Sequence, residues 1–197
     1  VKNNGPIAYW DVVNEAISNS DENYYKPDAV WFGTDVYQQT CDSFKWTKEI
    51  MTNNGQEVSN TELMYNEYDF ESLTRNQVKS DKVYQLMQNL TNDNCGIDGI
   101  GFQTHIDLTW TDADLDGIQA NIQRLAALGL KMHFTEIDVR CRKGWNAECP
   151  YGTESTDQWP QAALDWQAHI YARLLEICIE EPSCESYTVW GFTDAIH

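Results

Sequence analysis

The segment Gly99–Ile137, GIGFQTHIDLTWTDADLDGIQANIQRLAALGLKMHFTEI, contains the pattern that decides the fold. It begins and ends with runs of strand length, Gly99–Phe102 and Met132–Ile137. Between them, Thr111 and Asp114 have the spacing of a capping box, and Gly129 stands where a helix C-terminal cap is expected. The intervening apolar stripe has the spacing of one helix face, and consists of Leu115, Ile118, Ile122 and Leu125. Two strands separated by a single helix are predicted to run parallel.

The same alternation extends in both directions along the chain. Further strands are expected at Ile7–Val13, Glu62–Tyr65 and Tyr187–Phe192, and further helices at Asp35–Asn53, at Asn76–Leu90 and after Pro160. The order βαβαβαβαβ fits either a TIM (β/α)8 barrel or an open doubly wound sheet. No GxGxxG or P-loop pattern follows a predicted strand, which disfavours the nucleotide-binding open sheet. We therefore predict an α/β barrel, in which function gathers at the C-terminal ends of the strands.

Composition disfavours several classes of partner. The 197 residues carry a formal net charge of −18, so nucleic acid and anionic membrane surfaces are not expected to bind. No apolar run reaches the roughly 20 residues that cross a bilayer, and the first residues lack a signal-peptide layout, so any targeting segment is expected outside this chain. Eight Trp and ten Tyr suit stacking on sugar rings, although a core position is the default for each.

The six cysteines predict disulfides and an oxidising compartment, and hence a secreted protein. Cys141 with Cys149, and Cys178 with Cys184, are the local pairs expected, because each would close a short loop. The pairing of Cys41 and Cys95 is left open. No CxxC or HxxxH spacing is present, so no metal site is predicted.

Polar and aromatic side chains capable of chemistry stand at the C-terminal end of every predicted strand. They are Asn14 and Glu15, Asn66 and Glu67, Gln103 and His105, Glu136 and Asp138, and Trp190. A retaining glycosidase needs two carboxyl groups about 5–5.5 Å apart, one as nucleophile and one as acid and then base. An isolated Glu is most often a surface residue, but Glu15 and Glu136 each follow an apolar strand that should be buried. We therefore interpret these two as a catalytic pair across a cleft.

The other strand-end residues have supporting interpretations. A lone His is usually a core residue, but His105 lies on the strand between the two Glu-bearing strands, where an imidazole can hold a carboxylate ionised. Asp138 could orient that imidazole, and Asn14 could donate to a sugar 2-hydroxyl. Trp190 is either a platform beneath a sugar ring or a core residue.

These segments together closely resemble glycoside hydrolase family 10, the (β/α)8 endo-xylanases. WDVVNEA (10–16) resembles the acid/base strand of that family, HFTEIDVR (133–140) its nucleophile strand and YTVWGFTD (187–194) its strand eight. YNEYDFE (65–71) and GIGFQTHI (99–106) are similar to the motifs of strands five and six, although Glu67 and Asp69 stand where the family usually has Asp and Asn.

The resemblance implies retaining hydrolysis of internal β-1,4 bonds in xylan or xylo-oligosaccharides, without a cofactor. Glu15 would be the acid/base and Glu136 the nucleophile, with His105 and Asp138 tuning Glu136. The residues implied to bind substrate are Asn14, Gln103, Trp190, Tyr68 and Asn66. Cys178 and Cys184 match a short disulfide of many members.

The resemblance also implies that residues 1–197 are the C-terminal portion of a single catalytic barrel domain, about strands four to eight. Strands one to three are then expected from outside this chain, because five strands alone would leave two open sheet edges. Three alternatives remain: another retaining β-glycanase acting on cellulose or mixed-linkage glucan, a non-catalytic carbohydrate-binding or inhibitor-type relative, and an inert fragment.

Overall fold

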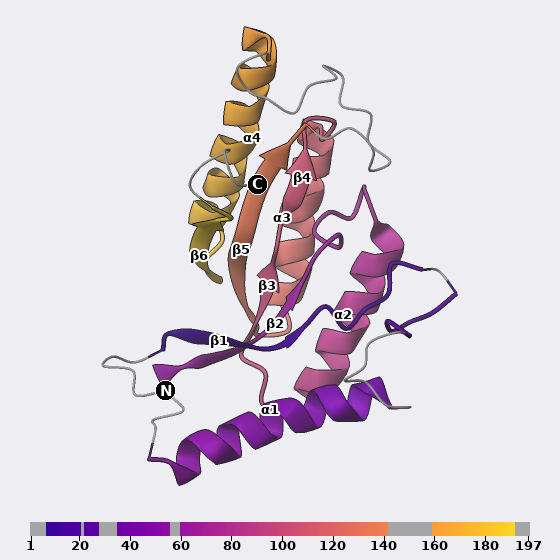
Figure 1. Ribbon diagram of the computed structural model, residues 1–197, viewed down its shortest axis with the longest axis vertical. Coiled ribbons are helices and arrows are strands. Elements are labelled where there is room, and N and C mark those ends of the chain that lie inside the picture. The colour runs from indigo at the N-terminus through magenta and orange to yellow at the C-terminus, as the bar shows by residue number, and fades with distance from the viewer. Residues whose placement is uncertain (1–6, 21, 28–34, 56–59, 142–158, 192–197) are drawn as a thin grey trace.

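The computed structural model describes residues 7–20, 22–27, 35–55, 60–141 and 159–191, in which strands and helices alternate (Figure 1). The strands are β1 (Tyr9–Asn14), β2 (Glu62–Glu67), β3 (Gly99–Phe102), β4 (His105–Asp107), β5 (Lys131–Arg140) and β6 (Cys184–Val189). The helices are α1 (Val36–Asn53), α2 (Gln77–Asn92), α3 (Asp112–Ala126) and α4 (Gln161–Glu180). No helix within these ranges is long and apolar enough to cross a membrane.

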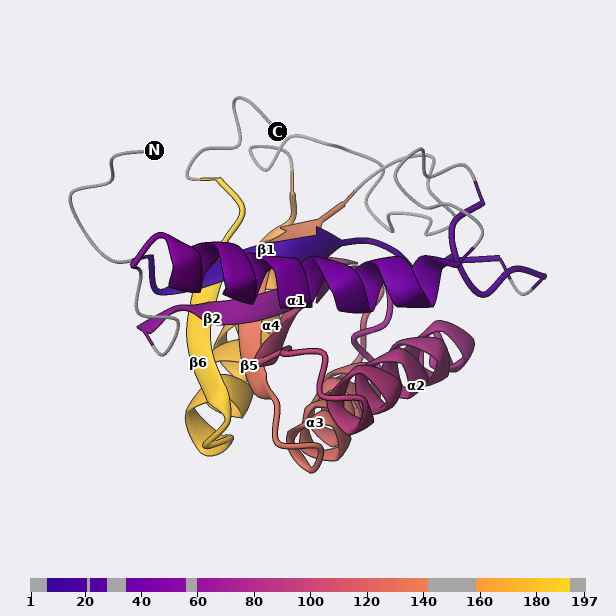
Figure 2. The same cartoon turned by 90° about the horizontal axis from the view of Figure 1, so that it is seen from below.

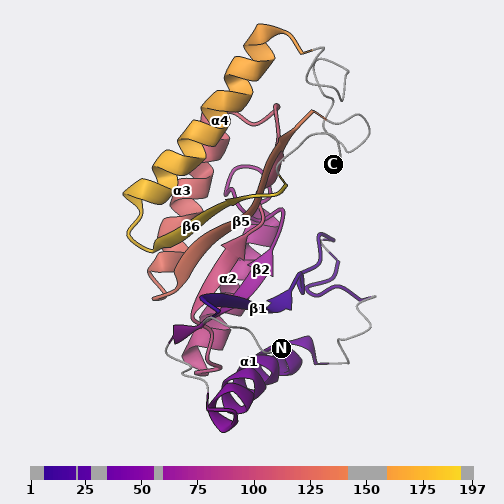
Figure 3. The same ribbon diagram turned by 60° about the vertical axis from the view of Figure 1, so that its left-hand side comes forward.

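The strands form one parallel sheet in the order β1-β2-β3-β5-β6. The short β4 also pairs with β5, directly beyond β3, so β3 and β4 together occupy one position in the sheet. Figure 3 shows α3 and α4 on one face of β5 and β6, and Figure 2 shows α1 running alongside β1 and β2. Parallel strands joined by helices on one face are the arrangement predicted for consecutive units of a barrel.

The helices α1, α2 and α3 each begin at a residue whose side chain caps the helix. Asp35 and Asn76 cap α1 and α2 by accepting hydrogen bonds from the backbone N–H groups of Gln38 and Lys79. Thr111 and Asp114 form both halves of the capping box that starts α3. Each such cap contributes about 0.5–2 kcal/mol. Gly129 follows α3 with φ of 82°, a conformation that favours glycine.

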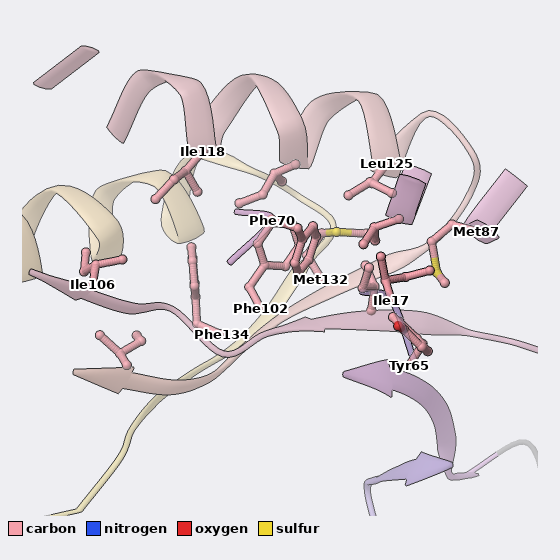
Figure 4. Packing of buried hydrophobic residues seen from close by; sticks show 14 of the residues in the cluster. Ile17, Tyr65, Phe70, Met87, Phe102, Ile106, Ile118, Leu125, Met132 and Phe134 are labelled. Carbon is pink, nitrogen blue, oxygen red and sulfur yellow. The ribbon is translucent and has the colours of Figure 1, made fainter. Parts of the chain in front are cut away.

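The core lies between the helices and the sheet. The rings of Phe70 and Phe102 are 4.7 Å apart, and Phe134 packs beside Phe102. Ile118 and Leu125 of α3 point toward these rings (Figure 4), and the whole predicted stripe of α3 is completely buried. Full burial of one such aliphatic side chain stabilises the fold by about 1.5–3 kcal/mol. The apolar side chains thus fill the space between the helices and the sheet. The polar strand-end residues lie away from this layer.

Several expectations about strands were wrong. The strand β1 begins at Tyr9 rather than Ile7, and β2 and β5 continue to Glu67 and Arg140 rather than ending at Tyr65 and Ile137. The last strand, β6, begins at Cys184 rather than Tyr187 and ends at Val189, so Trp190 lies in the loop after it. The strand β4 was not predicted as a separate element. Thr104 has φ of 62° and interrupts the ladder between β3 and β4, and no sequence pattern signals a β-branched residue in this conformation.

Two disulfides connect the described elements. Cys41 of α1 is joined to Cys95 in the loop after α2, across a sequence separation of 54 residues. Cys178 near the end of α4 is joined to Cys184 at the start of β6. The long closure contributes on the order of 4 kcal/mol by restricting the unfolded chain. Cys149 lies outside the described residues, and so does its expected pairing with Cys141.

Candidate active site

Glu15 directly follows β1 and has a backbone φ of 59°. Its N–H donates to the backbone oxygen of Asn66 on the neighbouring strand (2.9 Å). A left-handed residue turns the chain sharply, and non-glycine residues rarely adopt it unless other contacts hold them there. The backbone of β2 therefore fixes the point from which the Glu15 side chain projects.

Glu136 reaches the same region because β5 contains a bulge. Between Phe134 and Ile137 the ladder passes from Tyr187 to Val189 on β6, so β5 holds one extra residue there. Thr135 donates to the Asn66 side chain, and Glu136, the next residue, also contacts that side chain. In a regular strand consecutive side chains point to opposite faces, and a bulge re-aims one of them.

A chain of amide side chains links the two carboxylates. Asn66 Nδ2 donates to Glu136 Oε1 (3.1 Å) and to Asn14 Oδ1 (3.0 Å). Gln103 Nε2 donates to the same Asn14 oxygen (3.2 Å) and to Glu15 Oε1 (3.1 Å). The orientation of Asn66 is fixed because its Oδ1 accepts from Thr135 Oγ1 at 2.8 Å. Asn66 and Gln103 are each only 3% exposed, so these amides form the floor of the site.

Gly101 makes room for that floor. A Cβ added at this position would lie 2.3 Å from Asn66 Oδ1 and 2.9 Å from the Thr135 methyl group. Any larger residue would displace the Asn66 side chain and disturb its hydrogen bonds to Glu136 and Asn14, which explains a glycine inside β3.

His105 lies between two carboxylates. Its Nε2 is 3.3 Å from Glu136 Oε2, and its Nδ1 is 3.1 Å from Asp138 Oδ2. Burial alone would lower the pKa of His105, but the hydrogen bond and charge of Asp138 outweigh it, so the pKa is raised. Arg140 pairs in turn with Asp138 at 3.1 Å. A protonated His105 can donate to both carboxylates at once.

Lys26 contacts the other carboxylate. Its Nζ lies 2.8 Å from Glu15 Oε2 and 4.8 Å from the centre of the Tyr68 ring. Burial raises the pKa of Glu15, but hydrogen bonds from Lys26 and Gln103 and the Lys26 charge lower it by more, so the net pKa lies below its ordinary value. The two carboxylates therefore have different cationic partners, an ammonium for Glu15 and an imidazole for Glu136.

The structure brings the predicted residues to one end of the sheet. Asn14 is exposed, and Trp190 is 51% exposed with its ring 6.3 Å from that of His105. Tyr68 is half-buried beneath Lys26. Asn14, Tyr68 and Trp190 thus have surface that a sugar could contact, whereas Asn66 and Gln103 contact the carboxylates from below. In the described ranges, no three metal-binding side chains come together as a candidate metal site.

Sequence reasoning missed Lys26 and Gly101. Lys26 lies in the segment after Glu15 and belongs to no motif, so only its spatial contact reveals it. Gly101 was quoted within a motif but given no role, although a glycine inside a predicted strand is itself a signal of close approach. Taken together, the two carboxylates, their different partners and the exposed rings suit acid/base and nucleophilic attack on a glycosidic bond.

Comparison with known proteins points the same way. The chain is 34% identical over 190 residues to the endo-1,4-β-xylanase B of Thermotoga neapolitana, covering 96% of this chain and 47% of that protein. It is 32% identical to a thermostable celloxylanase of Thermoclostridium stercorarium, covering 95% and 44%. The crystal structure of xylanase 10B from Thermotoga petrophila RKU-1 in complex with xylobiose superposes with a TM-score of 0.72 at 34% identity, covering 94% of this chain and 48% of that one.

The chain thus spans about half the length of these relatives. The model of glycosyl hydrolase family 10 matches residues 2–196, nearly all of the sequence, and its (β/α)8 barrel agrees with the parallel sheet described above. The chain belongs to glycosyl hydrolase family 10.

Proposed function

We propose that this chain carries the two catalytic carboxylates of an endo-1,4-β-xylanase that retains anomeric configuration. The observation that supports this most directly is the amide chain of Gln103, Asn14 and Asn66, which joins Glu15 to Glu136 from below. Two carboxyl groups held by one short network are suited to a double displacement. The xylobiose bound to the Thermotoga petrophila xylanase supports xylan as the substrate class.

In this mechanism Glu136 attacks the anomeric carbon as the glycosidic bond breaks, and Glu15 gives its proton to the leaving oxygen. Glu15 then takes a proton from water, and that water attacks the glycosyl-enzyme ester and releases Glu136. His105, hydrogen-bonded to Asp138, faces Glu136 throughout. We assign sugar binding to Asn14, Gln103, Asn66, Tyr68 and Trp190, with the Trp190 ring as a stacking platform.

A second candidate is a related β-glycanase that also accepts glucan, because one relative carries the name celloxylanase. Xylose lacks the hydroxymethyl group of glucose, so a glucan-accepting enzyme needs more space beside the sugar ring than a xylanase does. We also propose that the protein is secreted, on the support of the disulfides Cys41–Cys95 and Cys178–Cys184.

The role assignment predicts different consequences for the two carboxylates. Glu136→Ala should abolish hydrolysis of both xylan and activated aryl xylobiosides, because no nucleophile remains. Glu15→Ala should spare the first step for leaving groups that need no proton, and azide should restore turnover by replacing the base-assisted water. Steady-state kinetics with and without azide provide the measurement, and the exposed Glu176→Ala on α4 is the matched control. Equal losses on every substrate, unaffected by azide, would contradict the assignment.

The contact between Lys26 and Glu15 predicts a shift in the pH profile. Lys26 lowers the pKa of Glu15, and the acid must be protonated in the free enzyme, so its ionisation sets the alkaline limb of kcat/KM. Lys26→Met removes the ammonium, raises the pKa of Glu15 and should move the alkaline limb to higher pH. Lys45→Met, at an exposed position on α1, should leave the profile in place. An alkaline limb that stays where it is in Lys26→Met would show that this ion pair does not act on the acid.

We further propose that additional strands complete the barrel beside β1 and β6. Within the described residues each of these strands pairs on one edge only, and Trp10 and Val189 on them are about half exposed. Unpaired backbone groups and exposed aromatic surface are costly in an isolated sheet. Residues 1–197 expressed alone should be insoluble or inactive on xylan. A soluble monomer of these residues that melts cooperatively and cleaves xylan would contradict this proposal.

A further inference from the structure

Three successive backbone N–H groups after β1 are bound by β2. The N–H of Glu15 donates to the Asn66 backbone oxygen at 2.9 Å. The N–H of Ala16 donates to Tyr65 Oη at 3.0 Å, and that of Ile17 donates to Glu67 Oε2 at 3.1 Å. Ala16 and Ile17 are completely buried. The backbone that carries Glu15 is thus fixed on its C-terminal side by two side chains of one neighbouring strand.

Glu67 is the centre of this arrangement. Its carboxylate has no exposed surface and accepts four hydrogen bonds. Oε2 accepts from Ile17 N and from Tyr65 Oη at 2.6 Å, and Oε1 accepts from Tyr68 N at 3.1 Å and from Lys79 Nζ at 3.0 Å. Lys79 is itself only 1% exposed, and its ammonium lies 3.7 Å from the centre of the Tyr68 ring. A buried carboxylate persists only when its charge is paired and its oxygens are hydrogen-bonded, and both conditions hold here.

The direction of these bonds connects Glu67 to Glu15. Burial and the charge of Glu67 raise the pKa of Tyr65 well above its ordinary value. The hydroxyl therefore stays protonated and donates a hydrogen bond to Glu67. The Tyr65 oxygen is then oriented to accept from Ala16. Glu15 at φ of 59° is in a conformation that needs external support. The Asn66 backbone oxygen supports Glu15 itself, and Tyr65 and Glu67 support the two residues that follow it.

We propose that Glu67, with Tyr65, is a positioning residue for the acid/base Glu15. It touches neither substrate nor the reacting atoms, and it acts by holding the backbone of Glu15–Ile17 so that the Glu15 carboxyl faces the leaving oxygen. Lys79 supplies the positive partner of the buried Glu67 carboxylate at 3.0 Å. This inference rests on the proposed retaining mechanism, in which Glu15 protonates the leaving group.

The test uses Tyr65→Phe in the protein that carries the whole barrel, because this change removes one hydroxyl and keeps the ring. Acid assistance matters for a poor leaving group and not for a good one. We expect kcat/KM for a phenyl xylobioside to fall by about 10- to 100-fold, and kcat/KM for a dinitrophenyl xylobioside to change by less than about 3-fold. Azide should raise kcat of the variant on the dinitrophenyl substrate, as it would for a loss of base function.

Thr40→Val on α1 is the control, since it also removes a buried hydroxyl that bonds within the protein. It should lower both rates equally or not at all. If Tyr65→Phe does not fold, kcat/KM of Glu67→Gln on the same two substrates, measured well below the Tm of that variant, provides the test. Equal losses on both substrates would overturn the inference and leave the proposed function intact. A wild-type protein that cleaves neither substrate would instead refute the proposed function itself.

Discussion

The hydrogen bonds of Asn66 are the interaction on which the rest of the site depends. This side chain is buried beneath the two carboxylates and donates both to Glu136 and to Asn14, which shares its oxygen with the Gln103 amide that binds Glu15. The side-chain oxygen of Asn66 accepts from Thr135, and its backbone oxygen accepts from the N–H of Glu15. Gly101 leaves the space that the Asn66 side chain occupies. The negative charges of two neighbouring carboxylates repel each other, and the amide donors offset this repulsion. In a site of low dielectric, such fixed hydrogen-bond donors stabilise a charge more strongly than they would in water.

The strand β2 therefore has two functions that follow from its alternating side chains. Asn66 faces the carboxylates and connects them, while Tyr65 and Glu67 face the opposite side and fix the backbone after β1. The apolar layer between sheet and helices supplies the rigidity that both sets of contacts need. Precise placement by rigid elements, rather than by loops, is what a reaction with a defined geometry requires.

The sequence predicted the parallel order of strands and helices because hydrophobic periodicity and capping residues are local signals. It also predicted that Glu15, His105 and Glu136 meet in one site, as a barrel collects functional groups, although Glu136 lies within β5 rather than at its end. The bulge in β5, the left-handed Thr104 and the contact of Lys26 with Glu15 could not be predicted, because each depends on partners distant in sequence. Glu67 was noticed as a strand-end residue and as a departure from a family motif, but its role was not predicted. Its ion pair with Lys79 and its hydrogen bonds explain how a charged residue can be buried in that strand.

A double displacement by Glu15 and Glu136 fixes the configuration of the first product, which therefore tests the proposed mechanism most directly. Proton NMR during hydrolysis of a xylo-oligosaccharide by the protein with the complete barrel distinguishes the two anomers before mutarotation mixes them. We predict that the β-anomer forms first and that the α-anomer appears only later. Initial formation of the α-anomer would mean that water attacks directly, and it would contradict the assignment of Glu136 as a nucleophile.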